Sequence, residues 1–401
     1  MHRTEALLEK CGNPHDNIPV IHIAGTNGKG STSAMIASIL RQTGKSVGLY
    51  TSPHLVNFNE RIRINGRPIR NDDIATFLAR HRPSIDLLES TFFETTTAMT
   101  FSYFAQNKVD IAVIEVGLGG RLDSTNVSKS ILSVLTPIHF DHMEFLGHDL
   151  DSITHEKCGI IKRNTPVVMA TQLPEVENII FSVASHKKAP FIKSSATVRL
   201  KKIELKDKGT SFIYDGQQMR MPLMGGHQIT NAQTAIAVIK TLDHEISKEE
   251  ISNALAKLNW PGRLQKINER PPVFYDVAHN AHGLKATLQT LRELFPQSDI
   301  NAICAIKKSK GLGDIARLLK LHCQDIITTS PDEVGFWTAN NLALEMGKYG
   351  INTTPVRSVS RALNCCFAKP DSNILWLIFG THFIAKHVYN KFGFPFDNGI
   401  I

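Results

Sequence analysis

The chain has 401 residues, of which 42% are hydrophobic and 20% charged, a balance typical of a globular protein. Because a single core rarely grows beyond roughly 250–300 residues, this length predicts two domains. No apolar run approaches the roughly 18 residues of a membrane helix, so no membrane partner is expected. The N-terminus has no signal-peptide or transit-peptide pattern, and the six cysteines form no CxxC pair. We therefore expect reduced thiols and a cytoplasmic location.

The formal net charge of +8 predicts an acidic partner. Nucleic acid is not favoured, because the basic residues are dispersed and the longest patch, KKSK at residues 307–310, is short. Anionic small molecules such as ATP and a polyanionic substrate explain the charge better.

Strand-like and helix-like patterns alternate over about the first 170 residues, which predicts a mostly parallel α/β sheet. The expected strands are residues 20–24, 47–50, 109–116, 131–135 and 166–170. The expected helices are residues 31–42, 94–106 and 151–162.

The pattern changes at residues 198–221, where alternating residues flank Asp215 and Gly216. An Asp-Gly pair between such segments is a strong hairpin signal, so we expect a small antiparallel piece. Helices are expected at residues 227–242 and 247–258.

The second of these helices has its own start signal. Ser247 is the expected N-cap, and Glu250, three residues later, completes a capping box. After it, the string WPGR at residues 260–263 breaks the pattern and marks the expected domain boundary.

A second strand–helix alternation follows this boundary and predicts a Rossmann-like C-terminal α/β domain. We therefore expect an ATP-binding phosphate-loop domain at residues 1–262 and a C-terminal domain at residues 263–401. The strands expected in the C-terminal domain are residues 273–277, 301–305, 325–329 and 374–379.

The string GTNGKGS at residues 25–31 lies between a predicted strand and a predicted helix, the context that a phosphate-binding loop requires. Glycines let backbone N–H groups point at phosphate oxygens, and Lys29 would reach the β- and γ-phosphates. The loop is shorter than the common form, and Gly30 separates Lys29 from Ser31. A structural turn is the alternative, but ATP binding is the favoured interpretation.

A phosphate loop needs magnesium, and magnesium needs oxygen ligands near the carboxyl ends of strands. Ser31 is the first candidate. Glu115 ends an apolar strand, where an unpaired carboxylate is costly to bury, so a cation is its natural partner. Ser52 also ends a strand. The alternatives are a solvated strand-end acid and an ordinary turn serine.

The segment after the strand at residues 131–135 contains His139, Asp141 and His142. By itself such a string is more often a loop network than a metal site. Lys157, by its local spacing, is an ordinary helix lysine.

Taken together, several strings resemble the folylpolyglutamate synthase and dihydrofolate synthase family, within the larger group of Mur-type amide ligases. They are GTNGKGS at 25–31, LYTSPHL at 49–55, FNERIRINGRPI at 58–69, EVGLGGRLDSTN at 115–126, DHMEFLG at 141–147, EKCGIIK at 156–162, PGRLQ at 261–265 and DVAHN at 276–280. The phosphate loop marks the ligase group, and the second and fourth strings together point to the folate branch.

The resemblance implies a role for each matching residue. The implied ATP contacts are Gly28, Lys29, Gly30, Ser31, Asn231, Arg263 and Asp276. Two magnesium sites are implied, one on Ser52 and Glu115 and one on His142, with Lys157 converted to a carbamate that serves the second ion. Asp276 and His279 match positions for the glutamate, and Thr381 stands at a substrate-binding position where the family has a serine. The pterin side would involve Phe93, Glu94, Thr95, Leu122, Asp123 and Ser124.

The implied reaction uses ATP to join L-glutamate to a reduced folate or to dihydropteroate, through an acyl phosphate, with release of ADP and phosphate. A monomer is the expectation from the family. Only eleven residues precede the string GNP at residues 12–14, where the family builds part of its pterin pocket. Folate is therefore the more secure substrate. The KKSK patch replaces a more acidic string of the family.

Two alternatives are weighed against this reading. One is an amide ligase of the same fold that acts on a cell-wall precursor, against which the two folate-branch strings argue. The other is a nucleotide-binding regulator without catalysis. The joint presence of Lys29, Glu115, His142, Lys157 and His279 argues against it, because binding alone needs few of them.

Overall fold

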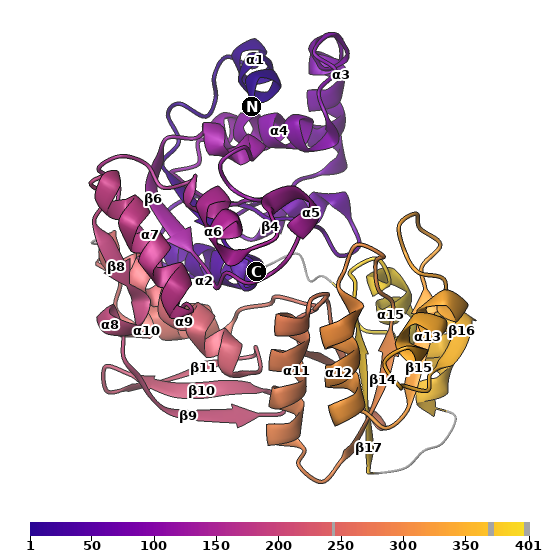
Figure 1. Cartoon of the computed structure of the whole chain (residues 1–401). Coiled ribbons are helices and arrows are strands. Elements are labelled where there is room, and N and C mark those ends of the chain that lie inside the picture. Colours follow the sequence, from indigo (N-terminus) through magenta and orange to yellow (C-terminus); the bar gives the residue numbers. More distant parts are fainter. Residues whose placement is uncertain (243–244, 368–372, 397–401) are drawn as a thin grey trace.

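The computed structural model describes residues 1–242, 245–367 and 373–396. Two α/β parts follow one another along the chain, each built on its own sheet (Figure 1). The N-terminal part is coloured indigo to magenta and the C-terminal part orange to yellow. This agrees with the expected fold class of two α/β units in sequence.

The N-terminal part is built on an eight-stranded sheet. In spatial order its strands are β4 (Arg67–Pro68), β3 (Ile62–Ile64), β2 (Val47–Tyr50), β5 (Ile111–Glu115), β1 (Val20–Ala24), β6 (Ser130–Leu135), β7 (Val167–Met169) and β8 (Phe191–Lys193). The six strands from β2 to β8 run parallel, and β3 and β4 form an antiparallel edge.

Helices cover both faces of this sheet, as its parallel strands require. Alternate strand residues such as Ile21 and Val113 face one core, and their neighbours such as Val20 and Ala112 face the other. The first face carries α2 (Lys29–Arg41), α8 (Ser194–Thr197), α9 (Gly226–Thr241) and α10 (Lys248–Ala256). The opposite face carries α1 (His2–Lys10), α3 (Asn71–Leu87), α4 (Phe92–Gln106), α6 (Leu150–Cys158) and α7 (Pro174–His186). The short helices α5 (Met143–Leu146), η1 (Phe58–Arg61) and η2 (Ser124–Val127) lie in its connections.

The expected antiparallel piece is a three-stranded sheet of β11 (Gln217–Met221), β10 (Gly209–Tyr214) and β9 (Leu200–Lys206). Its hairpin turns at Asp215 and Gly216, whose φ angles of 47° and 85° are both positive, as a type I′ turn requires. The capping box at the start of α10 is also confirmed, because Ser247 and Glu250 cap each other's backbone N–H groups.

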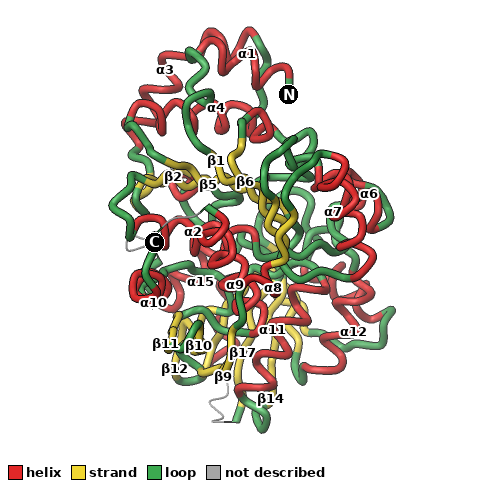
Figure 2. Tube along the Cα trace, turned by 90° about the vertical axis from the view of Figure 1, so that its left-hand side faces the viewer, coloured by secondary structure: helices red, strands yellow, loops and turns green. Residues whose placement is uncertain are grey.

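The C-terminal part is built on a six-stranded sheet. In spatial order its strands are β12 (Gln265–Glu269), β13 (Pro272–Asp276), β17 (Ile374–Phe379), β14 (Asp299–Cys304), β15 (Ile326–Ser330) and β16 (Thr354–Ser358), all parallel except β12. One face packs on α11 (Ala281–Leu294), α12 (Leu312–His322) and α13 (Ala339–Gly347), the other on α14 (Val359–Asn364), η3 (Cys365–Phe367) and α15 (Ala385–Phe392). Figure 2 shows the two groups of strands as separate layers.

The expected boundary between residues 262 and 263 falls in the connection between α10 and β12. Its exact place stays a prediction. One helix is shorter than expected: α6 ends at Cys158 rather than at residue 162. Gly159 follows it, and a Cβ atom there would lie 2.4 Å from the Cα atom of Arg121. The chain is therefore packed tightly against the neighbouring loop where the helix ends.

Within the described residues, no helix combines the length and the apolar character needed to cross a membrane.

Candidate active site

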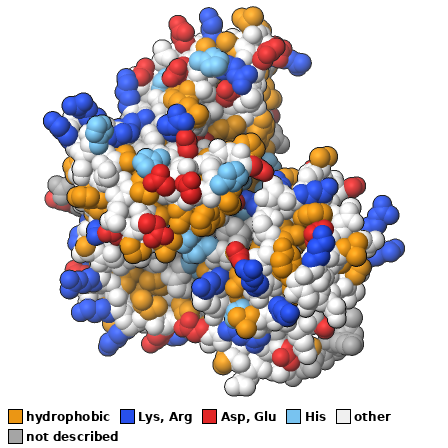
Figure 3. Space-filling model, in the orientation of Figure 1, with side chains coloured by type: hydrophobic (Ala, Val, Ile, Leu, Met, Phe, Trp, Pro, Cys, Tyr) orange, Lys and Arg blue, Asp and Glu red, His pale blue; other side chains and the backbone are white. Residues whose placement is uncertain are grey.

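The candidate site lies at the carboxyl ends of four adjacent parallel strands, where α/β sheets place their ligands. Ser52 follows β2, Glu115 ends β5, the loop at residues 25–28 follows β1, and the segment that contains His142 follows β6. These ends line a cleft of about 670 Å³, whose opposite wall comes from the C-terminal part. Figure 3 shows the surface hollowed between the two parts.

The phosphate loop has the backbone that its glycines permit. Gly28 has φ 84°, a left-handed conformation, and a Cβ atom there would lie 2.3 Å from Oδ1 of Asn231. Helix α2 begins at the next residue, so its free N–H groups face the cleft. The Lys29 ammonium donates to the carbonyls of Gly25 (3.1 Å) and Thr26 (3.2 Å), which keeps this cation over the loop.

Glu115 is 4% exposed, and its carboxylate accepts one hydrogen bond, from the backbone N–H of Ser52 (3.0 Å). Burial raises the pKa of Glu115, while the nearby Lys29 ammonium lowers it. A nearby cation would stabilise the charged form of a buried carboxylate with so little pairing. With the buried hydroxyl of Ser31 nearby in the same cleft, this donor set fits the oxygen ligands that magnesium prefers.

Lys157 is buried, and its ammonium donates to the carbonyl of Gly25 (2.9 Å). Burial, reinforced by the Lys29 ammonium, lowers the pKa of Lys157 to about 7. The lysine that looked ordinary in the sequence is therefore an interior amine that is partly neutral at physiological pH.

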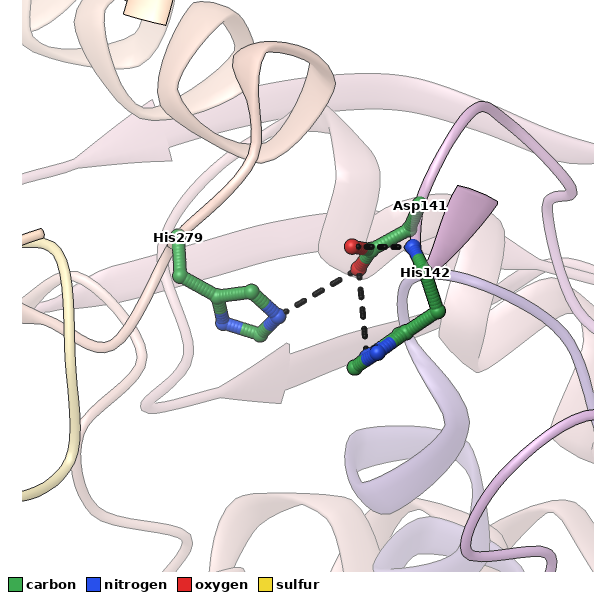
Figure 4. A group of neighbouring side chains, drawn as sticks. All are labelled: Asp141, His142 and His279. Atoms are coloured by element: carbon green, nitrogen blue, oxygen red, sulfur yellow. Dashed lines mark hydrogen bonds and ion pairs between the residues drawn. The ribbon is translucent and has the colours of Figure 1, made fainter. Parts of the chain in front are cut away.

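Asp141 is the point where the two parts meet (Figure 4). Its carboxylate accepts a hydrogen bond from Nδ2 of Asn280 (3.1 Å). The same carboxylate lies 3.4 Å from Nε2 of His279 and forms an ion pair with the ammonium of Lys310. Burial alone would raise the pKa of Asp141, but the contacts with His279 and Lys310 hold it well below its usual range. Asp141, His142 and His279 could together hold a metal ion, since one ligand atom from each lies within 4.8 Å of the others.

A second set of contacts joins the phosphate loop to the C-terminal part. Nδ2 of Asn27 donates to Nδ1 of His282 at 3.0 Å, and the ring of His282 stacks on His139 with 3.4 Å between centroids. Burial, with the nearby His282, lowers the pKa of His139 to about 4, so this ring is neutral at pH 7. The loops after β1 and β6 therefore both touch α11.

The linker also reaches the phosphate loop. A Cβ atom on Gly30, the second residue of α2, would lie 3.1 Å from the indole of Trp260, so a side chain there would press on this ring. The indole N–H of Trp260 is buried without a hydrogen-bond partner. Arg263, three residues further, lines the cleft itself.

The comparisons with known proteins agree with this geometry. A family model described as the Mur ligase middle domain matches residues 23–239, and one described as the Mur ligase glutamate ligase domain matches residues 262–381. The dihydrofolate synthase/folylpolyglutamate synthase of Bacillus subtilis is 37% identical over 334 residues, which are 79% of this chain and 78% of that protein. The chain belongs to the folylpolyglutamate synthase and dihydrofolate synthase family.

Solved structures of the family have the same fold. The folylpolyglutamate synthase of Mycobacterium tuberculosis complexed with ADP and AMPPCP superposes with a TM-score of 0.92 at 29% identity, over 98% of this chain and 95% of that one. The Escherichia coli FolC in complex with DHPP and ADP gives a TM-score of 0.87 at 29% identity, over 97% and 92% of the two chains.

Most residues that the family resemblance implies lie together. The residues that line the cleft are Gly28, Lys29, Gly30, Ser31, Ser52, Glu115, His142, Lys157, Asn231, Arg263, Asp276 and His279. Those that do not line it are Phe93, Glu94, Thr95, Leu122, Asp123, Ser124 and Thr381. The nucleotide and metal residues are thus brought to one place, and the residues expected for the folate and Thr381 are not part of it.

The carboxylates in the second group have internal partners. Asp123 accepts from the backbone N–H groups of Leu118 (2.9 Å) and Thr125 (3.0 Å), and Glu94 closes a capping box on Thr91 and pairs with Arg3. Both acids therefore organise the backbone around the cleft.

Two residues of the C-terminal part also have structural partners. Thr381 is buried, and its hydroxyl accepts from the backbone N–H of Phe383 (3.2 Å). Asp276 accepts from the backbone N–H groups of Leu264 (2.9 Å) and Ala278 (2.7 Å) and from the hydroxyl of Thr287 (3.1 Å). Asp276 thus holds the linker against the first strand–helix turn of the family's glutamate ligase domain.

Sequence reasoning missed the residues that join the two parts. Asn27 was part of the phosphate-loop string, and Asn280 part of the string DVAHN, but neither had a role of its own. Lys310 belongs to the basic KKSK patch, which had no assigned purpose. The signal available was this patch itself, an unusual run of cations in the chain.

Proposed function

We propose that this protein uses ATP and magnesium to join L-glutamate to a reduced folate, and that it also accepts dihydropteroate. The observation that carries the proposal is the convergence on one cleft of a phosphate loop and of candidate metal ligands, all of which follow adjacent parallel strands. The opposite wall of that cleft belongs to the part that matches the Mur ligase glutamate ligase domain.

In the proposed reaction, a carboxylate of the folate attacks the γ-phosphorus of ATP, which gives an acyl phosphate and ADP. The amine of glutamate then attacks the acyl carbon, the amide bond forms, and phosphate leaves. Lys29 and the N-terminus of α2 offset the negative charge of the transferring phosphoryl group. Much of the remaining rate enhancement comes from holding the reacting groups in position, because the reaction needs no covalent intermediate with the protein.

Ser31, Ser52 and Glu115 would hold one magnesium ion, and His142 with a modified Lys157 a second. When bound, the ions supply positive charge to the phosphate oxygens. The partial pairing of the buried Glu115 supports the first site.

The modification proposed for Lys157 is a carbamate. Its neutral amine would add to carbon dioxide and release a proton, which converts a buried cation into a carboxylate. The pKa of about 7 supports this step, because only the unprotonated amine can react. The nearby Lys29 ammonium would stabilise the product.

Asn231 and Arg263 would contact the nucleotide, and His279 would place the glutamate. Asp276 would act through the linker that it holds. Closure of the C-terminal part would exclude water, which otherwise hydrolyses the acyl phosphate.

The pterin end of the substrate would lie beside Phe93. Phe93 lies at the edge of the cleft, since a Cβ atom on the cleft residue Gly117 would be 2.3 Å from its ring. We therefore propose that the pterin stacks on the ring of Phe93, next to Thr95 and the loop at residues 122–124. Leu122 is 64% exposed there and is free to contact a ligand.

We also propose a monomer in the cytoplasm. The monomer follows from the resemblance to the family. All six cysteines are free, which supports a reducing compartment.

The test is glutamate-dependent phosphate release with ATP and magnesium, run in parallel on dihydropteroate and on a reduced folate monoglutamate. Turnover with both substrates is expected. Turnover with the folate alone would remove the dihydropteroate half of the proposal. Silence with both, while ATP still binds, would overturn the folate assignment.

A further inference from the structure

Lys310 reaches out of the C-terminal part to a carboxylate of the N-terminal part. Its ammonium pairs with Oδ1 of Asp141, and the two side chains are only 9% and 8% exposed. Asp141 follows β6, and Lys310 lies in the loop between β14 and α12. The ion pair therefore joins the two parts beside the cleft and is shielded from solvent.

The loop that carries Lys310 is held in place by its own contacts. The ammonium of Lys307 lies 4.7 Å from the ring centroid of Phe383, and that of Lys308 lies 5.8 Å from that of Trp337. The backbone N–H of Lys310 also donates to the carbonyl of Lys307 (3.1 Å). Of the three lysines in this patch, two are fixed on aromatic rings of their own part, and the third is directed at Asp141.

Separation of the two parts would break this ion pair and expose both charged groups to water. A buried charge pair with good additional hydrogen bonds resists such a separation, whereas removal of one partner leaves the other charge uncompensated. Asp141 has those additional bonds, because His142 donates its backbone N–H (2.9 Å) and Asn280 donates its amide (3.1 Å) to the same carboxylate.

We propose that Lys310 is a positioning residue that latches the C-terminal part over the cleft through Asp141. Lys310 is not among the residues that line the cleft, and its ammonium is directed at Asp141, so we assign it no contact with the substrate. It acts through Asp141 on the two residues that flank the site: His142, whose Nε2 lies 3.5 Å from the ammonium, and His279, which contacts the same carboxylate. The latch goes beyond the proposed function, but one of its two readouts depends on it.

The experiment compares Lys310→Met, which keeps the length of the side chain and removes its charge, with Lys308→Met as the matched control in the same loop. The first readout is hydrogen exchange of the loops at residues 137–147 and 278–283 in the full chain. Lys310→Met should increase exchange in both loops at least about fivefold, because an unlatched cleft opens more often. Lys308→Met should leave both loops unchanged.

The second readout is the ratio of phosphate released to glutamate incorporated. This ratio should rise at least about threefold in Lys310→Met, because water then reaches the acyl phosphate before glutamate does. Lys310→Arg, which restores a cation, should bring both readouts back toward the wild type. A purely structural role for Lys310 would change the melting temperature without changing this ratio.

The partner is tested with Asp141→Asn. The increase in hydrogen exchange that Lys310→Met causes is then measured in the Asp141→Asn protein. This increase should be less than about half of the increase in the wild-type background, since the two residues act as a pair. Equal effects in both backgrounds, or unchanged exchange in the single variant, would overturn the latch. If the wild type shows no glutamate-dependent turnover, the proposed function fails, whereas the exchange readout still decides on the latch.

Discussion

Asn27 and Asn280 hydrogen-bond each other through their side-chain amides, with Nδ2 to Oδ1 distances of 3.5 Å and 3.1 Å in the two directions. Asn27 belongs to the phosphate loop, and Asn280 begins α11 of the C-terminal part. The element that would hold the nucleotide is therefore tied directly to the C-terminal part, so we expect phosphate binding to depend on the position of that part.

Asn27→Ala should raise the KM for ATP by roughly three- to tenfold, because it removes the three side-chain hydrogen bonds that join Asn27 to Asn280 and His282. The melting temperature should stay close to that of the wild type. Asn280→Ala should raise the KM and also lower stability by about 1 kcal/mol, because its Oδ1 also caps α11 at the N–H of Gly283 (2.9 Å). Steady-state kinetics and thermal melts separate the two effects. Equal melting temperatures in both variants would contradict the second role of Asn280.

Glu115→Gln should lower kcat by roughly 100-fold and raise the magnesium concentration needed for half-maximal activity, because a ligand loses its charge. Without magnesium and ATP, the variant should be more stable than the wild type. Burial raises the pKa of Glu115, so its charged form is disfavoured in the folded state, and the amide oxygen can still accept from Ser52. Chemical denaturation and magnesium titrations are the measurements, with the exposed Glu9→Gln as control. A less stable apo form would contradict the account of Glu115.

Lys157 predicts a pH dependence of stability in buffers free of carbon dioxide. Its pKa is about 7 in the folded protein against 10.5 as the ordinary value, so the unfolded chain binds more protons between these limits. Stability contributed by this group therefore increases as the pH rises from 7, by at most about 1.4 kcal/mol per pH unit. Urea denaturation at pH 7, 8 and 9 measures the slope. Lys157→Met should have a smaller slope than the wild type, and the exposed Lys257→Met should not.

Ser247→Ala should lower the free energy of unfolding by about 1 kcal/mol, because it removes the hydroxyl of the capping box that starts α10. Ser252→Ala within the same helix is the matched control. It should leave stability unchanged or slightly higher, since alanine has the better helix propensity. Similar losses in both variants would show that the cap is not the cause.

Much of the fold follows from local patterns. The strands β1, β2 and β17 begin and end where the apolar runs do, because buried parallel strands are continuous in hydrophobicity. Elements without such a signal were missed: β12 is an edge strand with polar residues, and β4 has two residues. Helix α1 has too few residues for its period to be clear.

The residues of the candidate site also divide into those that local sequence patterns predict and those that they do not. The phosphate loop and Glu115 could be predicted because strand-end chemistry is a local pattern that topology then assembles. The burial of Lys157 could not, since it depends on Gly25, which is 132 residues away in the sequence. The pair of Asp141 and Lys310 spans 169 residues, and no periodicity relates such positions. Thr381 was predicted from the family resemblance alone, and its hydroxyl accepts a hydrogen bond from the backbone N–H of Phe383.

Trp260 adds a practical consequence to the contact between the linker and the phosphate loop. The chain has three tryptophans, and the indole of this one lies against Gly30, beside the place of the phosphates. Its ring is carried by the segment that connects the two parts. Because Trp337 and Trp376 also emit, a variant that keeps only Trp260 would report nucleotide occupancy and the position of this segment from one native side chain, without any attached dye.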